Sequence, residues 1–147
     1  MTDSHAPERA PMTDHTTKAF DVDLHEITGM VGEMGHEVEK EIAQALDGLG
    51  NRDADLAQRA IALDAGIDAL QHEIEEKAVL TIARRQPMAI DLREIIGAVR
   101  IANDLERMGD HATNLAETVY YMIEGHALAD QRPKGDTTTF AMLDAEK

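Results

Sequence analysis

The sequence contains no cysteine and no tryptophan, and it has only two phenylalanines and two tyrosines among its 147 residues. Without cysteine, the chain can form neither disulfide bonds nor thiolate metal sites. Because β-sheets favour aromatic and β-branched side chains, the shortage of aromatic residues indicates a core built from helices. The length is that of one domain with one sizeable core.

Long hydrophobic runs are missing as well. No apolar stretch approaches the roughly 18–20 residues that a membrane-spanning helix requires. The first twenty residues also lack the apolar segment of a secretory signal. We therefore expect a cytoplasmic protein with no direct insertion into a membrane.

Positive charge is scarce. The chain has 14 lysine and arginine residues against 29 aspartate and glutamate residues, for a net charge of -15. Nucleic acids and anionic membrane surfaces would repel such a chain, so we expect neither as a partner. The charge is compatible with metal cations or with a basic patch on a protein partner.

Three segments carry apolar residues at the three- and four-residue spacing of an amphipathic helix. The first runs from Leu24 to Leu49, the second from Leu56 to Ala78, and the third over residues 90–124. The glycines and the asparagine of residues 47–51 are expected to end the first helix. Pro87 is expected to end the second, because the residue before a proline disfavours helical backbone.

These segments predict an all-α fold, an elongated antiparallel up-down-up three-helix bundle over residues 17–125. Asp53 is expected to cap the second helix, and Gly125 to end the third. The third helix would be about 50 Å long, and helices of that length need antiparallel neighbours. Residues 1–16 and 126–147 lose the periodicity and are predicted to be disordered termini. Four methionines fall on or beside the apolar stripes and are expected to fill the core: Met30, Met34, Met108 and Met122.

An acidic pair stands out in the third predicted helix. Glu106 and Asp110 are four residues apart and therefore share one face, with about 5–6 Å between their Cβ atoms. Two carboxylates so close repel each other unless a cation neutralises them or one takes a proton. Asn103 and Asn114 extend the same line with further oxygen donors. The pair is a candidate metal site, and the alternative is a solvated polar stripe relieved by nearby arginines.

The second predicted helix carries a similar line of polar residues. Asp64, Asp68, His72 and Glu76 follow one another at four-residue intervals beside the apolar stripe. Oxygen donors with one imidazole suit hard or intermediate divalent cations. An antiparallel neighbour would bring this line towards Glu106 and Asp110, although charged residues beside a stripe are usually only solvated.

Enzymatic motifs are few. Glu33 and His36 form one Glu-x-x-His, a motif that supplies ligands in di-iron bundles, but those bundles need two copies and four helices. His36 is therefore expected at a surface position. The chain has no nucleophile–base pair, no glycine-rich phosphate loop and no serine elbow. We do not expect an enzyme.

Taken together, two stretches resemble the PhoU family of bacterial phosphate-signalling regulators. They are "ALDAGIDALQHEIE" on the second predicted helix, and "ARRQPMAIDLREIIGAVRIANDLERMGD" from the end of the second helix into the third. The order of the motifs also matches: Asp-x-x-x-Asp, then Gln-Pro followed by Asp-Leu-Arg, then Leu-Glu-Arg-x-Gly-Asp. The resemblance covers roughly residues 20–125.

This resemblance implies a function. Members of the family are cytoplasmic helical proteins that repress the phosphate-starvation response, linking the phosphate ABC transporter to a sensor histidine kinase. Some members bind iron or other metal clusters through Glu/Asp-x-x-x-Asp motifs. On this chain, the resemblance assigns a divalent metal or iron cluster to Asp64, Asp68, Glu106 and Asp110.

The chain departs from the family in its length. A typical member holds two three-helix repeats, and this sequence has room for one. The part up to Arg107 resembles a first repeat, and the part after it resembles the end of a second, as a deletion between the two Leu-Glu-Arg-x-Gly-Asp copies would produce. A homodimer would restore a six-helix body. Two alternatives stay open: a metal-carboxylate enzyme of the di-iron type, and a purely structural dimerisation bundle.

Overall fold

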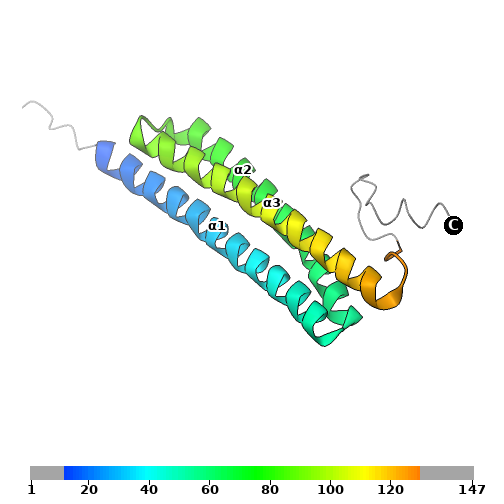
Figure 1. The fold of residues 1–147 in the computed structure, drawn as a ribbon. Helices are drawn as coiled ribbons and strands as arrows, with labels where there is room; N and C mark the ends of the chain where they lie inside the picture. Colours follow the sequence, from blue (N-terminus) through cyan, green and yellow to red (C-terminus); the bar gives the residue numbers. More distant parts are fainter. Residues whose placement is uncertain (1–11, 130–147) are drawn as a thin grey trace, which may run out of the picture.

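Three long helices make up the part of the chain that the structure, a computed structural model, describes, residues 12–129. They are α1 (Met12–Asn51), α2 (Ala54–Arg85) and α3 (Ile90–Glu124), and no strand occurs in this range. The helices lie side by side along their length in an elongated up-down-up bundle (Figure 1). The predicted all-α three-helix fold is thus confirmed.

The turn between α1 and α2 differs in one respect from the sequence prediction. The helix α1 continues through both glycines of residues 47–51, and the chain turns only at Arg52, whose φ is 51°. Gly48 is needed for packing: a Cβ there would lie 3.1 Å from the backbone nitrogen of Ala57. Asp53 caps α2 as predicted, with its Oδ1 accepting hydrogen bonds from the backbone N–H groups of Asp55 and Leu56.

The ends of the other two helices agree with the sequence. The helix α2 ends at Arg85, and Gln86 adopts left-handed backbone with φ 49° directly before Pro87. The helix α3 spans the predicted 90–124, and Gly125 closes it with φ 78°, a conformation that glycine adopts without strain. Helix α1 begins at Met12, five residues before the predicted start of the bundle at residue 17. The predicted disorder of residues 1–11 and 130–147 lies outside the described residues.

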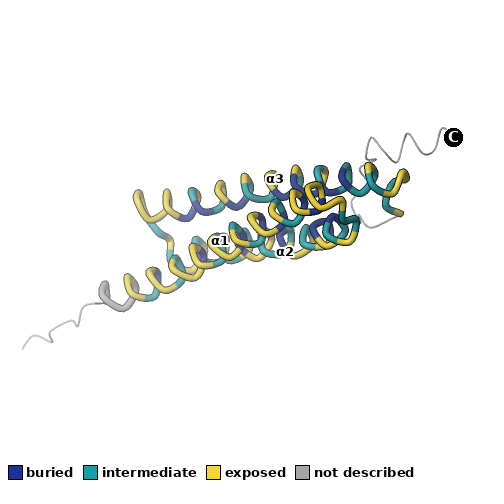
Figure 2. The backbone as a smooth tube through the Cα atoms, turned by 60° about the horizontal axis from the view of Figure 1, so that its bottom comes forward, coloured by how far each residue is buried: buried dark blue, intermediate teal, exposed yellow. Residues whose placement is uncertain are grey.

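The core runs along the whole bundle between the three helices. Figure 2 shows buried residues recurring along all three helices, with exposed residues between them. The larger of two clusters is built on Ile27, Met34, Ile67, Ile74 and Ile95, all fully shielded from solvent. The smaller cluster lies near the α1–α2 turn and contains the small side chains of alanines, which let the helices approach closely. Each predicted stripe contributes to this core.

Some residues expected in the core are exposed instead. Leu49, Met108 and Met122 expose 42%, 48% and 58% of their surface. Of the four methionines expected in the core, Met34 is buried and Met30 packs against the core, as predicted. The prediction was wrong because helical spacing identifies an apolar stripe but not its width, and a three-helix bundle covers only part of each helix.

Two cross-helix ion pairs connect α1 to α2. The Nε atom of Arg85 donates to Oδ2 of Asp23 at 2.9 Å, and Lys77 pairs with Glu26. Both pairs are partly exposed, so their contribution to stability is small beside that of the core. Within the described residues, no helix combines the length and the apolar character that crossing a membrane requires.

Candidate functional site

One hydrogen bond shows how α2 is aligned against α3. The Nε2 atom of Gln71 donates to Oδ1 of Asn103 at 2.8 Å. Because the two helices run antiparallel, a step back along α2 corresponds to a step forward along α3. Asp68 is therefore level with Glu106, and Asp64 with Asp110. The structure brings the four predicted ligands to two neighbouring levels of the line along which α2 packs on α3, here called the α2–α3 seam.

The four carboxylates of the seam are only partly accessible to water. All four side chains are half-buried, and the Oδ1 atoms of Asp64 and Asp68 are shielded from solvent. Partial burial weakens the screening of like charges by water. A bound cation or proton would relieve this repulsion.

The seam does not, however, form a complete metal site. Within residues 17–129, no three histidine, aspartate or glutamate side chains are arranged so that they could hold a metal ion. The pairs at each level thus provide only part of a ligand set, and a metal would need further ligands from outside the described chain.

The other predicted donors do not join the carboxylates. Asn103 already accepts a hydrogen bond through Oδ1, and Asn114 is exposed. His72 is exposed, with its Nδ1 atom 2.8 Å from the backbone oxygen of Asp68, and Glu76 is exposed too. In α1, Glu33 and His36 are both exposed, in agreement with the surface position expected for His36. Of the predicted ligands, the four carboxylates and Asn103 thus lie at the seam, and Oδ1 of Asn103 already accepts a hydrogen bond from Gln71.

The sequence analysis missed one carboxylate near this level. Glu41 of α1 is fully buried, and its Oε1 accepts a hydrogen bond of 2.5 Å from Oγ1 of Thr113. Its Oε2 lies 3.4 Å from the point that a Cβ on Gly109 would occupy, next to Asp110 in the chain. The signal was present in the sequence: Glu41 is three residues after the buried Val38 and thus on the core-facing side of α1.

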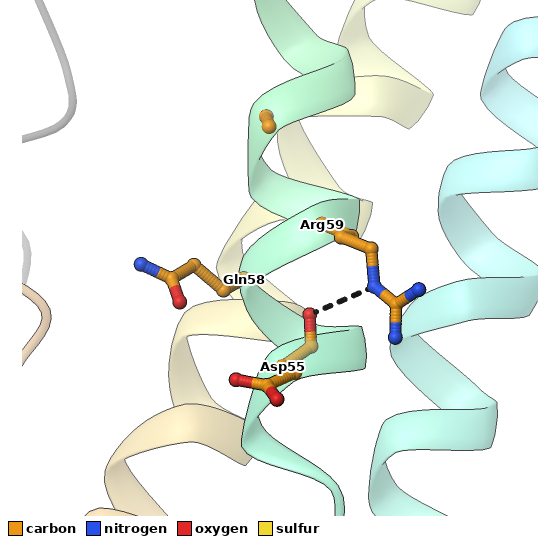
Figure 3. Close-up of a pocket in the computed structure, with 4 residues that line it drawn as sticks. Asp55, Gln58 and Arg59 are labelled. Atoms are coloured by element: carbon orange, nitrogen blue, oxygen red, sulfur yellow. Dashed lines mark hydrogen bonds between the residues drawn. The ribbon is translucent and has the colours of Figure 1, made fainter.

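A separate depression opens near the start of α2. It has a volume of about 580 Å³ and is lined by Asp55, Gln58, Arg59 and Ala62 (Figure 3). The Nε atom of Arg59 donates to the backbone oxygen of Asp55, so its guanidinium lies along the helix. All four lining residues come from one helix. Ligand sites usually have polar groups that converge from several elements, whereas the polar groups of this depression all come from α2.

The sequence of this chain is similar to that of known proteins. The sequence model of the PhoU domain matches residues 31–119, which reach from α1 through most of α3. A phosphate-specific transport system accessory protein PhoU homolog of Rhizobium meliloti is 48% identical over 105 residues, covering 71% of this chain and 44% of that protein. The homolog of Caulobacter vibrioides is 40% identical over 118 residues, covering 80% and 51%.

A third relative shows a similar partial coverage. The PhoU homolog of Clostridium acetobutylicum is 41% identical over 105 residues, covering 71% of this chain and 48% of that protein. The chain thus spans about half the length of the curated relatives that it matches. The domain match includes all four seam carboxylates. On these grounds, the chain belongs to the PhoU family.

Proposed function

We propose that this chain is a negative regulator of phosphate uptake and of the phosphate-starvation response. It would act in the cytoplasm as an adaptor between the phosphate ABC transporter and a sensor histidine kinase. The observation that carries the proposal is the PhoU-domain match across all three helices. The relatives are named as accessory proteins of the phosphate-specific transport system, which supports a role beside the transporter.

The surface of the bundle also favours an adaptor over an enzyme. The depression at the start of α2 is lined by residues of that one helix, so polar groups from several helices do not converge there. Its long helices instead offer extended faces with a high density of charge. Such faces suit recognition of other proteins, whose binding and dissociation depend on complementary charge.

Deletion of the gene provides the test of this function. Under abundant phosphate, the deletion is expected to raise expression of phosphate-starvation genes, because the repressing adaptor is lost. The measurement is a transcriptional reporter fused to a starvation promoter, with the parent strain as the control. An unchanged reporter level in phosphate-rich medium would contradict the proposed regulation.

We also propose that Asp64, Asp68, Glu106 and Asp110 bind a divalent metal or an iron cluster. The support is their alignment at two levels of the seam, their partial burial and their shared negative charge. Carboxylate oxygens are preferred by hard divalent cations. Since these residues form only part of a ligand set, the remaining ligands would come from water or from another protein surface.

The metal proposal predicts a loss of binding when one level of the seam is neutralised. The double variant Asp68→Asn, Glu106→Gln is expected to bind Mn²⁺ at least about tenfold more weakly than the parent chain, since it removes two charges that attract the cation. Isothermal titration calorimetry measures the Mn²⁺ affinity of each variant and of the parent chain. A matched control is Glu73→Gln, Asp91→Asn, which removes two exposed charges from the same helices. Equal affinities for the two double variants, or no Mn²⁺ binding by the parent chain, would refute the site.

We further propose that the protein forms a homodimer. The support is the exposed apolar side chains of Ile101, Met108 and Met122 on α3, because such side chains typically mark a surface that binds another protein. A symmetric homodimer would place the same surface of each copy against the other.

A further inference from the structure

The chain turns back onto the bundle after the end of α3. The ring of His126 contacts that of Tyr120 edge to face, with 5.9 Å between their centroids. Leu128 then packs, half-buried, against the smaller core cluster, which contains Ile61 of α2. Figure 1 shows this reversal in orange. The described part of the chain therefore ends against the bundle, and eighteen residues, 130–147, follow it in the sequence.

This end point lies close to the carboxylates of the α2–α3 seam. Asp64 and Asp110 form the nearer level, here called the first level, since Asp64 is three residues after Ile61. Asp68 and Glu106 form the second level, about 6 Å further along α2, because four helical residues rise by that length. Both levels thus lie within about two helical turns of the cluster that the end of the described chain contacts.

Arg132 and Lys134 are the first basic residues after this point. An extended chain rises by about 3.3 Å per residue, so Arg132 is at most about 13 Å from Leu128 and Lys134 at most about 20 Å. Pro133 stands between the two and disfavours helical backbone at Arg132. In extended backbone, residues two apart point to the same side, about 6.6 Å from each other. This spacing matches the separation of the two carboxylate levels.

The charges of the helices and of this basic pair are complementary. Helices α2 and α3 together carry thirteen acidic and seven basic residues. Arg84, Arg85 and Arg93 are three of the seven and adjoin the α2–α3 turn, at the opposite end of the bundle from residue 129. Residues 130–136 are neutral as a whole, with an aspartate on either side of the basic pair. The pair is therefore a compact positive centre, which the acidic excess of the seam attracts.

The environment of the seam favours an ion pair there over one in open solvent. Its four carboxylates are half-buried, so water screens their attraction to a cation less. The basic pair is also tethered to the bundle, which gives it a high effective concentration at the seam. By comparison, the ion pair of Asp104 with Arg107 is exposed on both sides, and pairs of that kind contribute little.

We propose that Arg132 and Lys134 bind the α2–α3 seam as an internal counter-ion, Arg132 at the first level and Lys134 at the second. The inference concerns the carboxylates of the metal site proposed above but does not require a metal. The guanidinium of Arg132 has five donors that can bond to both carboxylates of its level, and the ammonium of Lys134 acts as a point charge. A metal cation and the basic pair would compete for the same oxygens. Metal binding would therefore release residues 130–136 from the bundle.

Limited proteolysis with trypsin tests this contact in the full chain, in a chelating buffer without metal. Trypsin must bind the Lys134 side chain to cut the bond to Gly135, whereas the bond after Arg132 resists trypsin because proline follows. Binding of Lys134 to the seam therefore slows the cut. At about 20 mM salt, the double variant Asp68→Asn, Glu106→Gln is expected to be cut there at least about fivefold faster than the parent chain. At about 1 M NaCl, where the Debye length is about 3 Å, the difference is expected to shrink.

Two further variants control for other causes. Glu73→Gln, Asp91→Asn removes the same charge from the same helices at exposed positions outside the seam, and it is expected to be cut at the parental rate. Arg132→Gln removes the first anchor of the segment and is expected to raise the rate at Lys134 at least about twofold. Circular dichroism verifies that the helices of each variant are intact, and mass spectrometry identifies the bond that is cut.

Manganese titrations separate this proposal from the metal proposal. The variant Arg132→Gln, Lys134→Gln is expected to bind Mn²⁺ at least about threefold more tightly than the parent chain, since the competing cations are gone. If the parent chain binds no Mn²⁺ but Asp68→Asn, Glu106→Gln is cut faster, the internal contact stands and the metal site falls. If that variant and the parent chain are cut equally fast, the internal contact is overturned, whatever the Mn²⁺ affinity.

Discussion

Replacement of Ile67 by alanine is expected to lower the free energy of unfolding by about 3–4 kcal/mol. Ile67 is fully buried in the larger core cluster. Its Cδ1 and Cγ2 atoms lie 3.4 Å and 3.5 Å from the point that a Cβ on Gly109 would occupy, so the isoleucine fills the space that this glycine leaves. Truncation would open a cavity between α2 and α3, and Gly109 has no side chain that could fill it.

Urea denaturation followed by circular dichroism measures this loss. Val79→Ala is the matched control, because it removes a β-branched side chain from the same helix at an exposed position. It is expected to change the free energy of unfolding by less than about 0.5 kcal/mol. A loss below about 1 kcal/mol for Ile67→Ala would mean that the contact between α2 and α3 at Gly109 is looser than described.

The second large effect is expected at the buried pair of Glu41 and Thr113. Thr113→Val keeps the shape of the side chain but removes the hydroxyl that donates to Oε1 of Glu41. Because a buried carboxylate that loses a donor has no water to replace it, the expected loss is about 2–3 kcal/mol. Thr118→Val is the control, since the Thr118 hydroxyl bonds only to an exposed backbone oxygen four residues earlier.

A double-mutant cycle isolates the interaction. Combining Thr113→Val with Glu41→Met replaces both polar partners by apolar groups, and it is expected to recover at least half of the stability that Thr113→Val loses. The free energies come from the same urea titrations. If the two single losses simply add in the double variant, the hydrogen bond between these side chains does not contribute to stability.

Local signals in the sequence predicted the helices well. Asp53, Pro87 and Gly125 act on their immediate neighbours, through a cap, a steric restriction and a left-handed conformation, so their effects need no knowledge of the rest of the fold. The glycines of residues 47–51 misled the prediction because Gly48 serves close packing against α2 instead of ending α1. Spacing alone does not distinguish these two uses of glycine.

The width of the core was harder to predict than its existence. Met108 lies at helical spacing from buried residues, yet it faces outward because α3 has only two neighbours. Glu41 shows the opposite error: its charge suggests a solvent-exposed position, whereas its side chain is fully buried. The exposure of Met108 and the burial of Glu41 depend on which helices lie nearby and on how each helix is rotated about its axis. This information is distributed over the whole chain.

The candidate site was predictable in its residues but not in its alignment. The four-residue spacing of Asp64 with Asp68, and of Glu106 with Asp110, identified two acidic pairs. Their placement at matching levels depends on the register of α2 against α3, which the hydrogen bond of Gln71 reveals. A shift of one helical turn would leave each helix unchanged but reduce the two matched levels to one. Pairwise packing, and not local sequence, determines this geometry.

The most direct test of the regulatory role is rescue of a deletion strain in phosphate-rich medium. A strain lacking the gene, with a reporter on a phosphate-starvation promoter, would receive this chain on a plasmid or the empty plasmid. The proposed negative regulation predicts high reporter expression with the empty plasmid and a return to the parental level with the chain. Equal expression in the two strains, with the chain present in the cell extract, would contradict it.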